Sequence, residues 1–141
     1  MLTLRCFGGV CAFDHDGSEV TLRSRKHLGL LLYLVAHPRT THGREELAAL
    51  LWDGDGRRER HSLSQALYDI RTNLGPLLRV DANTVGVAAD HVTYEATEFE
   101  AALRAKDHAT ALDLYRGDFA PDLVNLDAEG FDRWLDDERE R

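Results

Sequence analysis

The 141-residue sequence lacks the features of a secreted or membrane protein. It has only two cysteines, Cys6 and Cys11, too few for a disulfide framework, and we expect free thiols in a reducing cytoplasm. No stretch approaches the roughly 18 consecutive apolar residues of a transmembrane helix. The N-terminus shows no basic segment leading into an apolar run and a cleavage site, so we expect no export signal. A cytoplasmic location without membrane attachment is predicted.

Motifs for catalysis and for bound ions are also missing. The sequence has no GxxxxGKS/T, GxGxxG or GxSxG segment, and nothing in it indicates nucleophilic catalysis. The loops 14–17 and 53–56 resemble calcium loops, but their twelfth positions are Arg25 and Ser64 instead of Glu. The cysteine and histidine pairs lie much farther apart than those of a zinc finger. We therefore expect no enzyme activity, no metal and no cofactor.

Charge is distributed unevenly along the chain. Residues 1–79 contain 11 Lys and Arg against 9 Asp and Glu, whereas residues 80–141 contain 6 against 16. Such asymmetry indicates parts with different partners. The first part can approach phosphates, and the second would be repelled by them. The net charge of −8 is thus concentrated in one part of the chain.

Hydrophobic periodicity predicts an α+β fold. Residues 2–22 alternate as short antiparallel strands, and Ser24 can cap a helix that ends at His37-Pro38. Residues 39–42 link to a second helix that ends at Trp52. The further elements expected are a helix over 57–74 stopped by Gly75-Pro76, a hairpin from 77–80 and 85–89, a short strand at 91–94, and helices beginning near 97, 109 and 128, the last reaching 141. The predicted order is sheet, three helices, hairpin, then an acidic helical part.

The third predicted helix has two different faces. Leu63, Ala66, Leu67, Ile70 and Leu74 form an apolar stripe at helical spacing. With Leu63 at the centre of the buried face, the outer face holds Arg57, Arg58, His61, Gln65, Tyr68 and Thr72, with Ser64 and Asp69 at the margins and Arg60 and Arg71 on one flank. Arg can pair with guanine and Gln with adenine, while hydroxyl groups serve phosphates. The alternative is the solvated polar face of an ordinary surface helix.

Several segments together resemble a known family. These are Ser24-Arg25-Lys26, Arg44-Glu45-Glu46-Leu47 with Leu51-Trp52, and Ile70-Arg71 with Leu74-Gly75, followed by 111–119 and by Phe131, Trp134 and Leu135. In this order and spacing they resemble SARP-type bacterial transcriptional activators. The first part is similar to the OmpR/PhoB-type winged-helix DNA-binding domain. The second is similar to the start of the bacterial transcriptional activator domain.

The resemblance implies both architecture and function. Residues 1–95 would form a winged helix-turn-helix domain with a four-stranded, N-terminal antiparallel sheet and a C-terminal hairpin wing. Residues 96–141 would begin a helical, tetratricopeptide-like domain. The third helix would read double-stranded promoter DNA, often as direct repeats that allow self-association, with recruitment of RNA polymerase.

Candidate contacts follow from the outer face and the neighbouring helix ends. Arg58, His61, Ser64, Gln65 and Tyr68 are candidates for the groove. The phosphate candidates are Arg57, Arg60, Arg71 and Thr72 on the third helix, Arg25, Lys26 and Arg44 at the starts of the first two helices, and Arg79 in the wing.

Two other interpretations stay open. The winged helix could be a protein-interaction or sensing module without DNA binding, as the acidic balance permits. It could also be an accessory domain of a larger multidomain protein. The aromatic residues Trp52, Tyr115, Phe131 and Trp134 lie on or beside apolar stripes, so we predict core packing for them in preference to a ligand cage.

Overall fold

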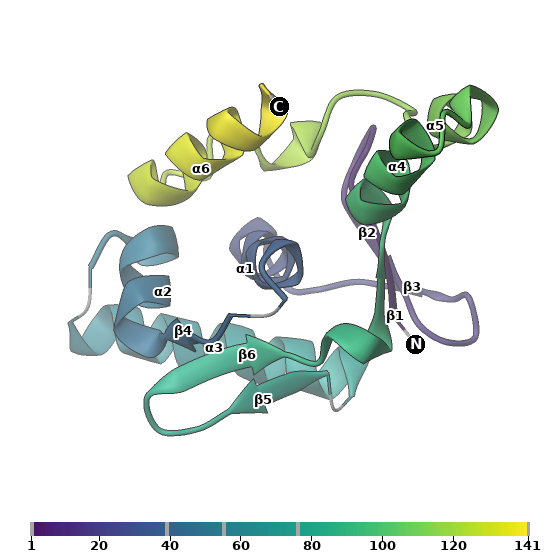
Figure 1. Cartoon of the computed structure of the whole chain (residues 1–141). Coiled ribbons are helices and arrows are strands. Elements are labelled where there is room, and N and C mark those ends of the chain that lie inside the picture. Colours follow the sequence, from purple (N-terminus) through teal and green to yellow (C-terminus); the bar gives the residue numbers. More distant parts are fainter. Residues whose placement is uncertain (1, 39, 55, 76, 141) are drawn as a thin grey trace.

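The structure is a computed structural model that describes residues 2–38, 40–54, 56–75 and 77–140 (Figure 1). Positions 39, 55, 76 and 141, which belong to the expected linker, loop, helix stop and last helix, lie outside the described residues, as does position 1. The elements are β1 (Leu2–Arg5), β2 (Cys11–Phe13), β3 (Glu19–Val20), α1 (Arg25–Ala36), β4 (His42–Gly43), α2 (Arg44–Trp52), α3 (Arg57–Leu74), β5 (Leu78–Val80), β6 (Thr84–Val87), η1 (Ala89–His91), β7 (Val92–Tyr94), α4 (Glu95–Arg104), α5 (His108–Leu114), η2 (Pro121–Leu123) and α6 (Glu129–Arg139). This is the mixed α+β class that the sequence predicted.

The N-terminal strands form a four-stranded sheet in the order β3-β2-β1-β7. The first three strands pair antiparallel, as expected. The fourth strand, β7, pairs parallel to β1, with Leu4 opposite Tyr94. The expectation of a wholly antiparallel sheet is therefore wrong at this edge. A parallel neighbour requires a long crossover, and here that crossover contains the three helices and the hairpin.

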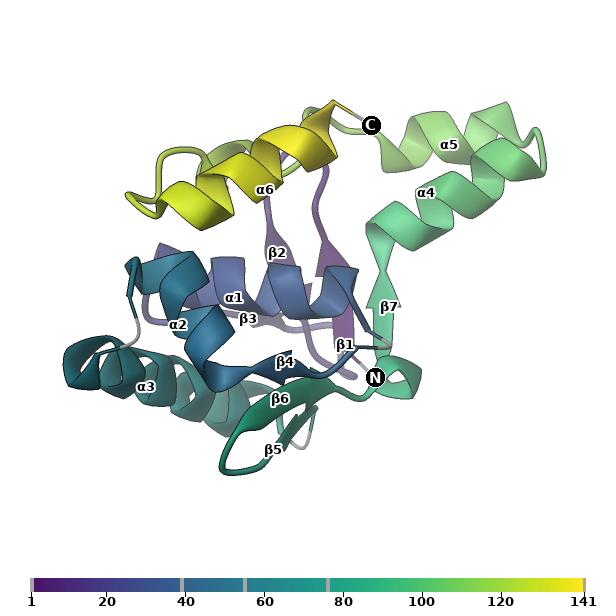
Figure 2. The same ribbon diagram turned by 60° about the vertical axis from the view of Figure 1, so that its left-hand side comes forward.

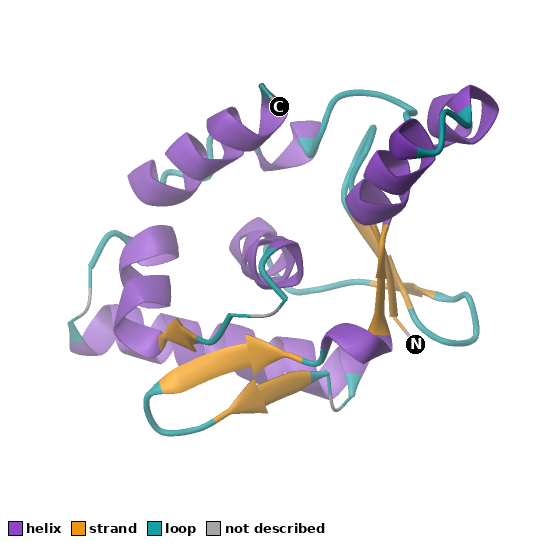
Figure 3. Cartoon of the chain, in the orientation of Figure 1, coloured by secondary structure: helices purple, strands orange, loops and turns teal. Residues whose placement is uncertain are grey.

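Helices α1, α2 and α3, drawn in purple in Figure 3, share one apolar core with the sheet. Ser24 caps α1, since its Oγ accepts a hydrogen bond from the His27 N–H at 3.2 Å. The predicted stripe of α3 is buried at Leu63, Ala66, Leu67 and Ile70. Because this stripe packs inward, the opposite face of α3 has to point away from the core.

A second, three-stranded sheet has the order β4-β6-β5. The hairpin of β5 and β6 agrees with the expected one. Strand β4 was not predicted, because His42 falls in the expected linker and Gly43 at the expected start of the second helix, and two residues are too few to show a period. His42 pairs with Val85, so the start of α2 is held to the hairpin.

Helix α6 packs back onto α1 and α2. Phe131 of α6 is fully buried in the common core. A methyl group on Gly29 of α1 would come within 3.2 Å of the Phe131 ring, so glycine permits this close approach. In both views α6 lies on one side of α1 and α2, and α3 lies on the other (Figures 1 and 2).

Within the described segments, no helix is both long enough and apolar enough to cross a lipid bilayer.

Candidate nucleic-acid interface

The outer face of α3 is open to solvent. Exposed side chains along it are Arg57, Arg58, His61, Ser64, Gln65, Tyr68, Arg71 and Thr72. Tyr68 is the most prominent aromatic group there, with 67% of its surface exposed. Helix α6, which carries much of the acidic charge, is separated from this face by α1 and α2 (Figure 2). The face can therefore meet a large partner without displacing α6.

Two contacts connect α3 to α2 on one flank. The Arg44 guanidinium donates from Nη2 to Oγ of Ser64 at 2.9 Å. Nη2 of Arg60 lies 3.2 Å from Oε1 of Glu45, and both side chains are mostly exposed. An exposed ion pair such as Arg60–Glu45 contributes only about 0–1 kcal/mol, so Arg60 can exchange its partner at small cost.

The hairpin lies beside the same flank. The Arg44 N–H donates to the Asn83 carbonyl in the β5–β6 turn at 2.8 Å. Asp81 shapes that turn by accepting hydrogen bonds from the N–H groups of Asn83 and Thr84, and these bonds hold its pKa below the ordinary value. Arg79 is exposed on β5. Arg44 thus joins α2 both to α3 and to the hairpin that carries Arg79.

The two cations at the start of α1 differ in their surroundings. Arg25 donates to main-chain carbonyls of the C-terminal part, from Nε to Asp122 O at 2.9 Å and from Nη2 to Val124 O at 2.8 Å. Nζ of Lys26 lies 6.0 Å from the centre of the Trp52 ring. The structure brings Lys26 toward α2 and turns Arg25 toward the acidic part.

Sequence reasoning missed a small polar network at the junction of α1 and α3. Asp69, expected at the margin of the outer face, is only 3% exposed. It accepts hydrogen bonds from the Arg23 N–H and lies 2.6 Å from Nδ1 of His27. Arg23 and His27 line a shallow hollow together with Ser64, Gln65 and Tyr68. Arg23 is exposed, and it is therefore a further cation beside the candidate face.

The described residues contain no group of three or more His, Cys, Asp and Glu side chains placed to hold a metal ion. Both cysteines are free thiols in the structure.

Comparison with known proteins identifies a similar fold. The solved structure of Mycobacterium tuberculosis EmbR in complex with a low-affinity phosphopeptide matches 99% of this chain with a TM-score of 0.74 and 18% sequence identity. The match covers 42% of the EmbR chain, so this chain spans less than half of that protein. No protein-family model matches the sequence, and no curated protein sequence matches it. The likeness shows a shared fold.

Proposed function

We propose that this chain is a sequence-specific DNA-binding regulator of transcription of the SARP type. In this proposal residues 1–95 form a winged helix, and α3 enters the major groove of duplex DNA. The observation that carries it is the outer face of α3, where Arg58, His61 and Gln65 are exposed on a helix held from behind by its buried leucines. The major groove is wide enough to admit such a helix.

Each side chain has a proposed role. Arg58, His61, Gln65 and Tyr68 contact base edges, and Ser64 lies beside them. Phosphates are contacted by Arg57, Arg60, Arg71 and Thr72 of α3, by Lys26 and Arg44 at the starts of α1 and α2, and by Arg79 of the hairpin. Arg23 joins this set, because it lines the hollow next to Gln65 and Tyr68. Arg25 keeps its predicted phosphate role only if DNA displaces it from its two carbonyl partners.

The shared fold supports the regulatory role. EmbR is a SARP-family regulator, and its structure matches nearly the whole length of this chain. The sequence segments that resemble SARP activators support the same assignment. We infer from them a role as an activator that recruits RNA polymerase, with copies associating on direct repeats and with residues 96–141 opening a tetratricopeptide-like domain.

The electrostatic repulsion between this chain and DNA is weaker than the net charge suggests. The acidic excess belongs to residues 80–141, and α6 lies on the far side of α1 and α2 from α3. Repulsion between α6 and phosphates is weakened by distance and by salt, since the Debye length is about 8 Å at physiological ionic strength.

A site-selection experiment tests the proposal. Duplexes enriched from random DNA are used in gel shifts with the wild type, with Arg58→Ala plus Gln65→Ala, and with a matched control, Arg104→Ala plus Arg133→Ala. We expect the first double variant to fold normally and to lose specific binding, whereas the control binds like the wild type. Log K should also fall steeply with log salt for the wild type.

Two results would contradict the proposal. One is unchanged affinity in the Arg58→Ala plus Gln65→Ala variant. The other is enrichment of no duplex at any salt concentration, which would favour a protein-interaction module without DNA binding.

A further inference from the structure

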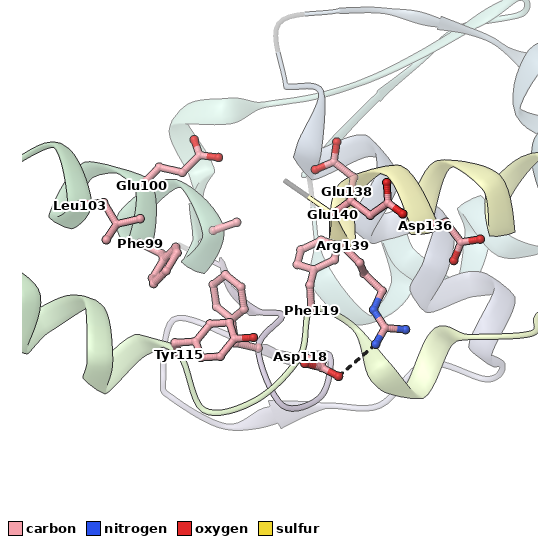
Figure 4. Close-up of a pocket in the computed structure, with 12 residues that line it drawn as sticks. Phe99, Glu100, Leu103, Tyr115, Asp118, Phe119, Asp136, Glu138, Arg139 and Glu140 are labelled. Carbon is pink, nitrogen blue, oxygen red and sulfur yellow. Dashed lines mark hydrogen bonds and ion pairs between the residues drawn. The ribbon is translucent and has the colours of Figure 1, made fainter.

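A groove of about 510 Å³ lies between the α4–α5 hairpin and α6 (Figure 4). Figures 1 and 2 show these helices away from α3. We call it the α4–α6 groove. Leu103 and Phe99 of α4 and Tyr115 stand on one side, and the C-terminal end of α6 with Asp136 and Arg139 stands on the other. Its volume is in the range of binding pockets for small molecules or for a few side chains of a partner.

The floor of the groove is a cluster of aromatic rings. The ring of Phe7 lies 5.0 Å from that of Phe99, 5.3 Å from that of Tyr115 and 6.0 Å from that of Phe119. Phe7 and Phe119 are buried, but 47% of Tyr115 and 46% of Leu103 remain exposed. Tyr115 therefore departs from the core packing that the sequence predicted. Leu112 on α5 is also 74% exposed, but it does not line the groove.

The rim of the groove is acidic. Among the described residues that line it, Arg139 is the cation, and it pairs with Asp118 at 3.1 Å. The carboxylates beyond this pair are Glu100, Asp136, Glu138 and Glu140. An aromatic floor attracts cations and apolar groups alike, and carboxylates at the rim add attraction for positive charge. The same carboxylates repel phosphate, so the occupant is not nucleic acid.

We propose that the α4–α6 groove binds a basic amphipathic segment of a partner protein. Apolar side chains of that segment pack on Phe99, Leu103 and Tyr115, and its Lys or Arg side chains meet the carboxylates of Glu100, Asp136 and Glu140. The negative charge of the rim favours a partner segment of positive charge. The half-exposed Leu103 and Tyr115 favour a polypeptide over a small molecule, because exposed apolar surface rimmed by polar groups marks sites of protein contact.

The test uses the full chain and two fluorescent helical peptides with the same leucine face, one carrying lysines and the other glutamates. Anisotropy is measured at low and high salt, and the contact surface is mapped by shifts of backbone amide signals. We expect the lysine peptide alone to bind, more weakly at high salt, with the largest shifts around Phe99, Leu103 and Tyr115. This readout does not depend on DNA binding.

Matched variants locate the site. Asp136→Lys should weaken binding of the lysine peptide about fivefold, because it replaces an attraction with a repulsion. Asp137→Lys changes the neighbouring exposed carboxylate, which does not line the groove, and should have little effect. Leu103→Ser should weaken binding on the order of tenfold, whereas Leu112→Ser, outside the groove, should not.

Three results would overturn the proposal. The glutamate peptide could bind as tightly as the lysine peptide. The Asp136 and Asp137 variants could lose affinity equally. The chain could also form a dimer in sedimentation experiments that buries Leu103 and Tyr115, in which case the occupant is a second copy of the chain.

Discussion

Nδ1 of His27 lies 2.6 Å from Oδ2 of Asp69, and this contact joins the first turn of α1 to the middle of α3. The same carboxylate accepts hydrogen bonds from the Arg23 N–H and from the Asn73 amide, each at 2.8 Å. A buried carboxylate is tolerated only when its oxygens are satisfied in this way. The network therefore sets how α3 is held against α1, directly behind Gln65 and Tyr68.

Asp69→Asn should destabilise the protein by about 1–3 kcal/mol at neutral pH. An amide has one oxygen in place of two, so its NH2 group would face donors of the network. Urea unfolding measures the free energy of unfolding of each protein. Asp113→Asn, on an exposed position of α5, is the control and should change little.

The stability of Asp69→Asn should also depend less on acid pH than the stability of the wild type. Burial raises the pKa of Asp69, but hydrogen bonds from His27 and Arg23 together outweigh it and lower the pKa below 3.8. The carboxylate thus stabilises the fold above the unfolded-state pKa, and this stability is lost as the pH falls through the lower folded-state pKa. As the pH falls below about 4, the wild type should lose more stability than Asp69→Asn. Parallel curves for the two proteins would contradict this assignment.

Arg25→Ala should weaken the attachment of the C-terminal part more than it weakens DNA binding. It removes the hydrogen bonds to the carbonyls of Asp122 and Val124, at a cost of about 1 kcal/mol for an exposed arginine. Thermal unfolding and gel shifts measure the two effects, with Lys26→Ala as the neighbouring control. If Arg25→Ala left stability unchanged and reduced DNA affinity severalfold, Arg25 would instead be a phosphate contact.

Gly117→Ala should destabilise the fold by about 1–3 kcal/mol. A methyl group at Gly117 would lie 2.9 Å from Cα of Gly8, and main-chain atoms there cannot move aside as a flexible side chain could. Gly43→Ala is the control, since its nearest contact would be 3.9 Å away, on the side chain of Glu46. Equal and small changes in melting temperature would show that the loop at Gly8 adapts.

The two thiols should react at very different rates. Burial, followed by the nearby Glu95 carboxylate, raises the pKa of Cys6 to about 12, whereas Cys11 is partly exposed. Since the thiolate is the reactive form, a disulfide reagent at pH 8 should modify Cys11 first and Cys6 only when the protein unfolds. Cys11→Ser should abolish the early phase. A fast reaction of Cys6 in the folded wild type would contradict the prediction.

Local sequence signals were sufficient to predict a helix and its ends where all the residues concerned belong to that helix or directly flank it. Helix α3 begins at Arg57 and ends at Leu74, as its apolar stripe and the following glycine predicted. The Ser24 cap of α1 forms as expected, because capping involves only neighbouring residues. The angular argument nevertheless failed for Asp69, which is buried by the packing of α1 over α3.

The sequence by itself determined the order of the three helices and the hairpin, the two faces of α3 and the separation of basic from acidic charge, since periodicity and composition are properties of the chain. Only the tertiary structure decided that β7 would pair with β1, that Arg25 would turn toward Asp122 and that Tyr115 would stay half open beside an acidic rim. These features join residues far apart in the chain. They arise from packing between whole elements, and no local pattern encodes such contacts.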